Sequence, residues 1–80
     1  MNASQAVATR IRQLCKQYKI TPNALSYQAA VPQSTIKSIL NGESANPGIV
    51  TIKKLCDGLD ISLIKFFDSP LFADLEQEIK

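Results

Sequence analysis

Residues 21–42 read TPNALSYQAAVPQSTIKSILNG, and this stretch decides the fold. The opening Thr21-Pro22 pair is typical of a helix start, because the hydroxyl accepts an otherwise unbonded amide and proline has no amide to leave unbonded. The closing Asn41-Gly42 pair is typical of a helix end. The stretch therefore predicts one helix over 22–29 and a second over 32–40, joined by a tight turn.

The second of these helices has two different faces. Ile36, Ile39 and Leu40 cluster on one side, as a core face does at helical spacing. The opposite side carries amide, hydroxyl and ammonium groups and no carboxylate: Gln33, Ser34, Lys37, Ser38 and Asn41. A helix face that is merely solvated usually includes glutamate, so this set favours hydrogen bonds to base edges and phosphates in a DNA major groove.

The chain has 80 residues and a net charge of +2, but its charge is unevenly distributed. Residues 1–42 hold five cations and no acid, whereas residues 43–80 hold four cations and seven acids. The first part is therefore +5 and the second −3, an asymmetry that needs a physical reason. For Arg12, Lys16 and Lys19 on the first helix, a solvated face is the alternative.

The composition argues against an enzyme. The sequence has no histidine, no Gly-rich phosphate loop and no nucleophile motif, and Cys15 and Cys56 fit no metal-ligand spacing. We therefore predict no catalysis, no metal and no cofactor, with both cysteines reduced and buried. No apolar run reaches the roughly 18 residues that span a membrane, and the N-terminal residues lack the pattern of a secretory signal. The expected location is the cytoplasm, with no membrane partner.

The remaining apolar spacing is also helical, and no strand pattern is present. We expect a first helix over 4–18 with Ser4 as its N-cap, a helix over 49–59, and a helix over 63–68 that is capped by the preceding serine. Gly58 weakens the last turn of its helix. A Ser-Pro pair then opens a C-terminal extension, residues 69–80, in which the pattern leaves open a short sixth helix.

Several short motifs are spaced as in a known family of regulators. The motifs are Ile20-Thr21, Leu25-Ser26, Ala30-Val31, Ser34-Thr35-Ile36 and Asn41-Gly42, and a further match follows over residues 47–63. They resemble the Cro/CI-type (XRE-like) helix-turn-helix family of phage and bacterial repressors, and the resemblance covers residues 8–67. It implies an all-α, five-helix, lambda-repressor-like DNA-binding domain, with the third helix in the major groove and the second across the DNA backbone. We expect one such domain over residues 1–80.

The resemblance also implies roles for single residues. Base contacts fall to four residues of the third helix: Gln33, Ser34, Lys37 and Ser38. Phosphate contacts fall to Thr21, Asn23, Thr35 and Asn41. For Gln33, Ser34 and Lys37 the alternative is an exposed side chain without a ligand.

Four features depart from the family pattern. Ala30 stands in place of the usual turn glycine, and Pro32 stands in place of a side-chain cap. The family's Arg–Glu pair between its first and third helices corresponds to Cys15 and Leu40, which are both apolar and so leave no unpaired charge. The loop over 43–48 has one acid and no cation where the family is often basic, so we expect weaker phosphate contact and lower salt sensitivity.

Two functions fit these observations. The first is a sequence-specific transcriptional regulator, a repressor, that binds double-stranded DNA as a homodimer on a palindromic operator and needs no small-molecule ligand. The second is a protein-interaction module with the same fold, such as an antitoxin or an adaptor. The apolar residues of the extension either form a dimer or partner surface or fold back on the domain: Leu71, Phe72, Leu75 and Ile79.

Overall fold

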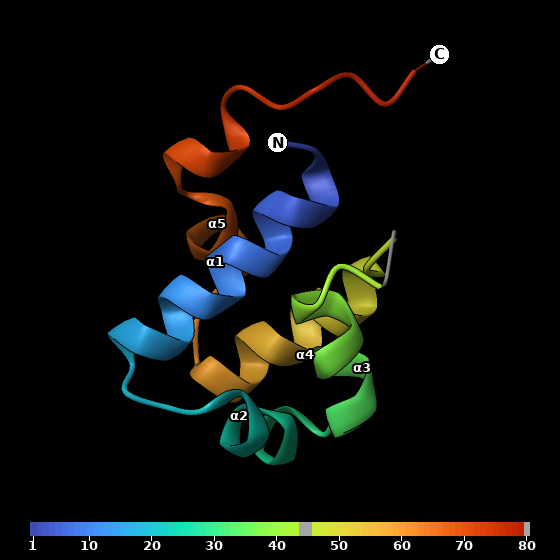
Figure 1. Ribbon diagram of the computed structural model, residues 1–80. Helices are drawn as coiled ribbons and strands as arrows, with labels where there is room; N and C mark the ends of the chain where they lie inside the picture. Colours follow the sequence, from blue (N-terminus) through green and yellow to red (C-terminus); the bar gives the residue numbers. More distant parts are fainter. Residues whose placement is uncertain (44–45, 80) are drawn as a thin grey trace.

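Five α-helices and one turn of 3-10 helix surround a common core (Figure 1). The computed structural model describes residues 1–43 and 46–79. Its elements are α1 (Ala3–Gln17), α2 (Pro22–Ala29), α3 (Gln33–Leu40), α4 (Ile49–Leu59), α5 (Leu63–Phe67) and the 3-10 turn η1 (Pro70–Phe72). Strands are absent from the described residues, and the all-α prediction is confirmed. None of the described helices is both long and apolar enough to cross a membrane.

The start of α1 differs from the prediction. Asn2, not Ser4, is the N-cap: Asn2 Oδ1 accepts a hydrogen bond from the Gln5 amide at 2.9 Å, and Gln5 Oε1 accepts one from the Asn2 amide at 2.9 Å. This reciprocal capping box satisfies two amides at once, whereas a serine N-cap satisfies one. The assignment of Ser4 is therefore wrong, while the predicted bounds of α2 and α4 are confirmed.

The C-terminal extension holds a 3-10 turn and no sixth α-helix. Ser69 Oγ accepts a hydrogen bond from the Leu71 amide at 3.2 Å, as the Ser-Pro signal predicts, but helical structure ends with η1. Farther along, the Glu76 amide donates to the Met1 carbonyl at 3.2 Å, which ties the segment to the start of α1. Asp74 and Glu78, four residues apart, would repel each other weakly on a helix, which disfavours a helical path here.

The core receives side chains from all five α-helices. The largest fully buried side chains are Ile11, Leu14, Leu25, Ile36, Leu55, Cys56 and Phe66. The Phe66 ring lies 4.9 Å from the Phe67 ring and 6.2 Å from the Phe72 ring, between ring centroids, so η1 packs against α5. Cys15 and Cys56 are both free and buried, as predicted, and burial raises the pKa of both thiols.

Helices α2 and α4 approach each other closely at Gly58. A Cβ atom placed on Gly58 would lie 2.9 Å from Ala29 Cβ and 3.0 Å from both Ala29 Cα and the Ala29 nitrogen. These separations are shorter than van der Waals contact, so only glycine fits between the two backbones. The residue that weakens the last turn of α4 therefore has a packing role.

The first four helices end in the same backbone pattern. In each, a residue in the left-handed conformation closes the helix, and the next amide bonds a carbonyl five residues back, as in the Schellman motif. The left-handed residues are Lys19, Ala30, Gly42 and Asp60. Three of these are not glycine, and each such residue carries a steric cost of roughly 1–2 kcal/mol from its Cβ.

Replacing Ala30 by glycine is expected to stabilise the protein by about 0.5–1 kcal/mol, because relief of the left-handed strain exceeds the added entropy of the unfolded chain. Ala30 has φ 54° and an exposed side chain, so the change removes no core contact. Thermal unfolding followed by circular dichroism measures the effect. The exposed Ala24 of α2 is the matched control, since glycine there should destabilise. A lower melting temperature for Ala30→Gly would show that the left-handed conformation of Ala30 carries no such steric cost.

Candidate nucleic-acid interface

A three-residue turn between α2 and α3 fixes the direction of α3. Ala30 reverses the chain, and the buried Val31 donates its amide to the Ser26 carbonyl at 3.0 Å. The Pro32 carbonyl then accepts the Thr35 amide at 3.0 Å, which starts α3. The turn is therefore held by backbone bonds at both sides and by one buried side chain.

Helix α3 buries its apolar face and leaves its polar face in solvent, as the sequence predicts. Ile36 and Ile39 are buried, and Leu40 packs against the core. On the other face, the exposed residues are Gln33, Ser34, Lys37 and Asn41, and the half-buried ones are Thr35 and Ser38. α1 and α2 pack against α3, so the polar face is presented by a supported helix.

Most of the predicted DNA-contacting residues share one hollow of about 490 Å³ between the start of α2 and the outer face of α3. We call it the recognition hollow; its lining residues are Arg12, Pro22, Asn23, Gln33, Ser34, Ile36, Lys37, Leu40 and Asn41. It brings three predicted base-contacting residues together with two predicted phosphate-contacting residues from different helices. The hollow thus joins the two classes of contact that a DNA reader needs.

The other predicted residues lie outside the recognition hollow. Ser38 and Thr35 line a second, shallower hollow of about 370 Å³ together with Ser34 and Glu43. Thr21 is the N-cap of α2, where its Oγ accepts the Ala24 amide at 3.1 Å. Ser34 therefore lines both hollows, whereas Thr35 and Ser38 line only the one that also holds the Glu43 carboxylate.

Backbone amides at two helix starts add hydrogen-bond donors to this surface. Pro32 gives α3 no side-chain cap, and within the described residues the amides of Gln33 and Ser34 have no partner. At the start of α2, Pro22 has no amide to offer, so the Asn23 amide is the corresponding donor. Helix starts carry partial positive charge and bind anionic oxygens.

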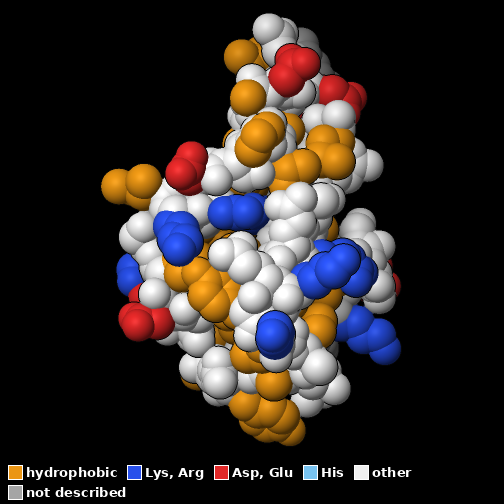
Figure 2. Space-filling view, turned by 90° about the vertical axis from the view of Figure 1, so that its left-hand side faces the viewer, with side chains coloured by type: hydrophobic (Ala, Val, Ile, Leu, Met, Phe, Trp, Pro, Cys, Tyr) orange, Lys and Arg blue, Asp and Glu red, His pale blue; other side chains and the backbone are white. Residues whose placement is uncertain are grey.

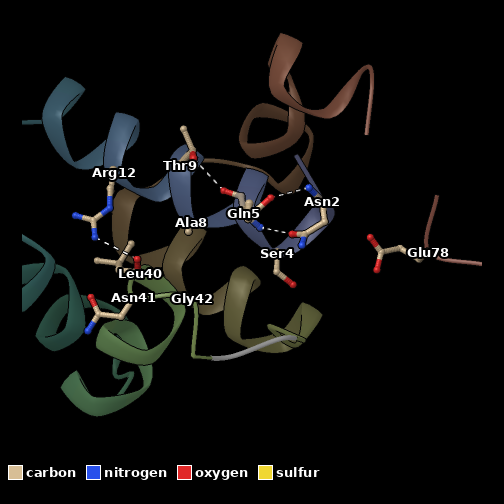
Figure 3. Close-up of a pocket in the computed structure, with 10 residues that line it drawn as sticks. All are labelled: Asn2, Ser4, Gln5, Ala8, Thr9, Arg12, Leu40, Asn41, Gly42 and Glu78. Carbon is tan, nitrogen blue, oxygen red and sulfur yellow. Dashed lines mark hydrogen bonds between the residues drawn. The ribbon is translucent and has the colours of Figure 1, made fainter. Parts of the chain in front are cut away.

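Two arginines of α1 bind the C-terminal ends of other helices, which sequence reasoning did not anticipate. Arg10 Nε donates to the Phe66 carbonyl at 2.7 Å and Arg10 Nη2 to the Lys65 carbonyl at 2.9 Å, at the end of α5. Arg12 Nη2 donates to the Leu40 carbonyl at 3.2 Å, at the end of α3 (Figure 3). Cations stabilise these ends because the terminal carbonyls carry partial negative charge.

The link between α1 and α3 is therefore made by Arg12 rather than by a pair of side chains. Cys15 is buried and Leu40 packs against the core, so the positions of the family's ion pair are apolar here. Arg12 also lines the recognition hollow and so joins the candidate interface. The only sequence signal for it was its place on the basic stripe of the first helix.

The uneven charge along the sequence becomes an uneven charge in space. Figure 2 shows basic side chains across the middle of one face and acidic side chains along its left edge and at its upper end, where Figure 1 places the C-terminal segment. That segment carries Asp74, Glu76 and Glu78, whereas α1 and α3 carry four cations and no acid. Glu78 of this segment lines a neighbouring hollow of about 500 Å³ together with Arg12 and Asn41, which also line the recognition hollow, so the acidic segment borders the candidate interface.

Comparisons with known proteins agree with this geometry. The chain is similar to the prophage Lp1 protein 11, with 33% identity over 94% of this chain and 100% of that chain and a TM-score of 0.82. It also shares the fold of the wild-type restriction-modification controller protein C.Esp1396I, with 22% identity over 80% of this chain and 81% of that chain and a TM-score of 0.73. No curated protein sequence matches the chain significantly.

A family model decides the assignment. The model of the Cro/C1-type HTH DNA-binding domain matches residues 10–65, which include α2, the turn and α3 as well as α4. The match spans more than half of the chain and ends within α5. The protein therefore belongs to the Cro/C1-type helix-turn-helix family of DNA-binding domains.

Proposed function

We propose that this protein is a sequence-specific transcriptional regulator, a repressor acting in the cytoplasm, which binds double-stranded DNA through α3 in the major groove. The observation that carries the proposal is the recognition hollow, where Asn23 of α2 meets Gln33, Lys37 and Asn41 of the α3 surface. An exposed polar helix face with neighbouring phosphate-binding groups is what major-groove readout requires.

Phosphate contacts come from the helix starts and their neighbouring side chains in this proposal. The Asn23 amide and the first two amides of α3 are available donors at positively polarised ends. Thr21 already accepts one amide with its hydroxyl oxygen, and its O–H remains able to donate to a phosphate oxygen. Asn41 offers its side-chain amide at the other end of α3, while Thr35 is half-buried and makes the weakest of the four proposed contacts.

Base contacts come from the exposed face of α3. A glutamine side chain can bond adenine at two atoms, and a lysine can bond the acceptors of guanine. Gln33 and Lys37 stand one turn apart on the recognition hollow and fit these roles. Ser34 and Ser38 complete the proposed base contacts, with Ser38 on the side that faces Glu43.

A homodimer on a palindromic operator extends the proposal, because one α3 reads only a few base pairs. The residues suggested for the dimer surface differ in exposure: Phe72 packs against the rings of Phe66 and Phe67, Leu71 and Leu75 are half-buried, and Ile79 is 87% exposed. Ile64 of α5 is 83% exposed nearby in sequence. We propose that α5 and the exposed part of the extension form the seam.

Binding is expected to weaken with salt, but less steeply than in more basic DNA readers. Of the two cations that line the recognition hollow, Arg12 is bonded to the Leu40 carbonyl, which leaves Lys37, so a dimer would neutralise about two phosphates and give a slope of roughly −2 in log K against log salt. Fluorescence anisotropy with a DNA site selected in vitro, titrated at several salt concentrations, measures this slope. Binding that ignores salt, or that ranks all sequences alike, would remove the proposed function.

The alternative function is a protein-interaction module of the same fold, such as an antitoxin or adaptor. The observation that favours it is exposed apolar surface outside the DNA face: Ile49 is 58% exposed and Val50 66% exposed at the start of α4. Co-purification of one defined partner, with no shift of any DNA in the selected library, would support this alternative instead.

A further inference from the structure

The C-terminal end of α3 has an unusually complete set of hydrogen bonds. The last four carbonyls of a helix have no partner within it. Here the amides of Asn41, Gly42 and Glu43 bond three of them, those of Lys37, Ile39 and Ser38, at 2.9, 3.2 and 2.9 Å. The fourth carbonyl belongs to Leu40 and is the one that Arg12 of α1 binds.

The bond from Arg12 is suited to holding this end in place. Its donor is a charged guanidinium and its acceptor lies at the negative end of a helix, a combination stronger than a neutral hydrogen bond. The two residues are separated by 28 positions in sequence, so the bond ties α3 to a different helix rather than to its own loop. Figure 3 shows the Arg12 side chain reaching toward Leu40, with Asn41 at the same end of the surface.

The same end of α3 carries two proposed DNA-contacting residues. Lys37 lies in the last turn and Asn41 is the C-cap, and both line the recognition hollow with Arg12. α3 has only eight residues, so a small tilt at its end moves both side chains relative to a base pair. Site geometry must be held to within a fraction of an ångström for selective hydrogen bonding.

We propose that Arg12 is a positioning residue that fixes the C-terminal end of α3 against α1 and thereby sets the sequence selectivity of the DNA interface. The effect on selectivity rests on the proposed function, whereas the effect on α3 does not. Arg12 takes the place of the link that the apolar Cys15 and Leu40 positions no longer provide. Arg12 acts on α3 through its hydrogen bond to the Leu40 carbonyl, and its positive charge strengthens that bond.

The first experiment needs no DNA. Hydrogen exchange by NMR is measured at the amides of residues 41–43 in the wild-type protein, Arg12→Ala, Arg12→Lys and Lys16→Ala. We expect exchange at these three amides to speed up about five- to tenfold in Arg12→Ala, with little change in α4, because the opening is local. Lys can still donate to the carbonyl and should restore most of the protection. Lys16→Ala removes an equal charge from the exposed face of α1 and should change nothing here.

The second experiment measures selectivity. Affinities for the selected site and for its single-base variants are compared at several salt concentrations, well below the melting temperature of every variant. We expect the ratio between the selected site and its variants to fall about three- to tenfold in Arg12→Ala, with partial recovery in Arg12→Lys and a salt slope near that of the wild type.

The outcomes separate the two proposals. If exchange at residues 41–43 is unchanged in Arg12→Ala, the positioning role is overturned. It is overturned equally if selectivity is unchanged while affinity for all DNA falls and the salt slope of the dimer drops by about two, because Arg12 of each copy is then a phosphate contact. If exchange changes as expected but the wild-type protein selects no sequence, Arg12 positions α3 and the proposed DNA-reading function fails.

Discussion

Replacing Gln33 by alanine is expected to relax the preference at one base pair of the operator and to weaken binding to the preferred site by about 1–3 kcal/mol per contact. Gln33 opens α3, is exposed and lines the recognition hollow. Its side chain has one donor group and one acceptor, which together match adenine in the major groove. Alanine removes both partners and offers nothing that prefers another base, so the loss is confined to one position.

Selection from a random DNA library, repeated with the variant, measures this effect directly. The matched control is Gln28→Ala, because Gln28 is an exposed glutamine of the neighbouring α2 that lines a different hollow with Tyr18 and Lys19. The control should keep the wild-type site and affinity. If Gln33→Ala selects the same site as the wild type at every position, Gln33 does not read a base.

The sequence predicted well those parts of the fold that depend on local chemistry. The start of α2 carries its own signal, Thr21-Pro22, and the predicted bounds of the helix are confirmed. The start of α1 was missed because Asn2 and Ser4 are both good caps, and the choice depends on whether Gln5 can bond back. The sequence contained that signal, three residues after Asn2.

Contacts between helices could not be predicted in the same way. The bond from Arg10 to the end of α5 joins residues more than fifty positions apart, and its acceptors are backbone carbonyls that no side-chain pattern marks. In the sequence, Gly58 is only a residue of low helix propensity. Its packing role is evident only in the structure, where α2 approaches α4. Such features depend on three-dimensional packing rather than on propensity.

The candidate site shows the same division. Helical spacing placed Gln33, Ser34 and Lys37 on one face, and the structure brings them to one hollow with Asn23. Helical spacing alone did not separate Ser38 from them, because its surroundings depend on the left-handed Gly42, after which the chain turns and brings Glu43 beside Ser38. The assignment of Ser38 as a base contact therefore needs its own test, which is DNA selection repeated with a Ser38→Ala variant.

Replacing Gly58 by alanine is expected to destabilise the protein by about 1–3 kcal/mol, although alanine is the better helix residue. In an open helix position the change should stabilise by roughly 0.5–1 kcal/mol, so the sign of the result decides between propensity and packing. Chemical unfolding followed by circular dichroism measures the difference. Ala24→Gly at an exposed position of α2 is the matched control, because read in reverse it measures the propensity difference without a close backbone. A more stable Gly58→Ala protein would show that α2 and α4 can separate without cost.

The consequence of this packing for DNA binding follows from the place of Ala29. It is the last residue of α2, directly before the left-handed Ala30 that sets the direction of α3. The atoms that a new Cβ would meet include the Ala29 backbone as well as its side chain, so Ala29→Gly cannot fully relieve Gly58→Ala. We therefore expect the folded Gly58→Ala protein to bind the selected site more weakly and the double variant to recover only part of that affinity, measured by anisotropy where both are fully folded. Full recovery of the affinity would mean that α4 restrains α2 through the Ala29 methyl group alone. The contact with the Ala29 backbone would then not fix the position of the helix-turn-helix.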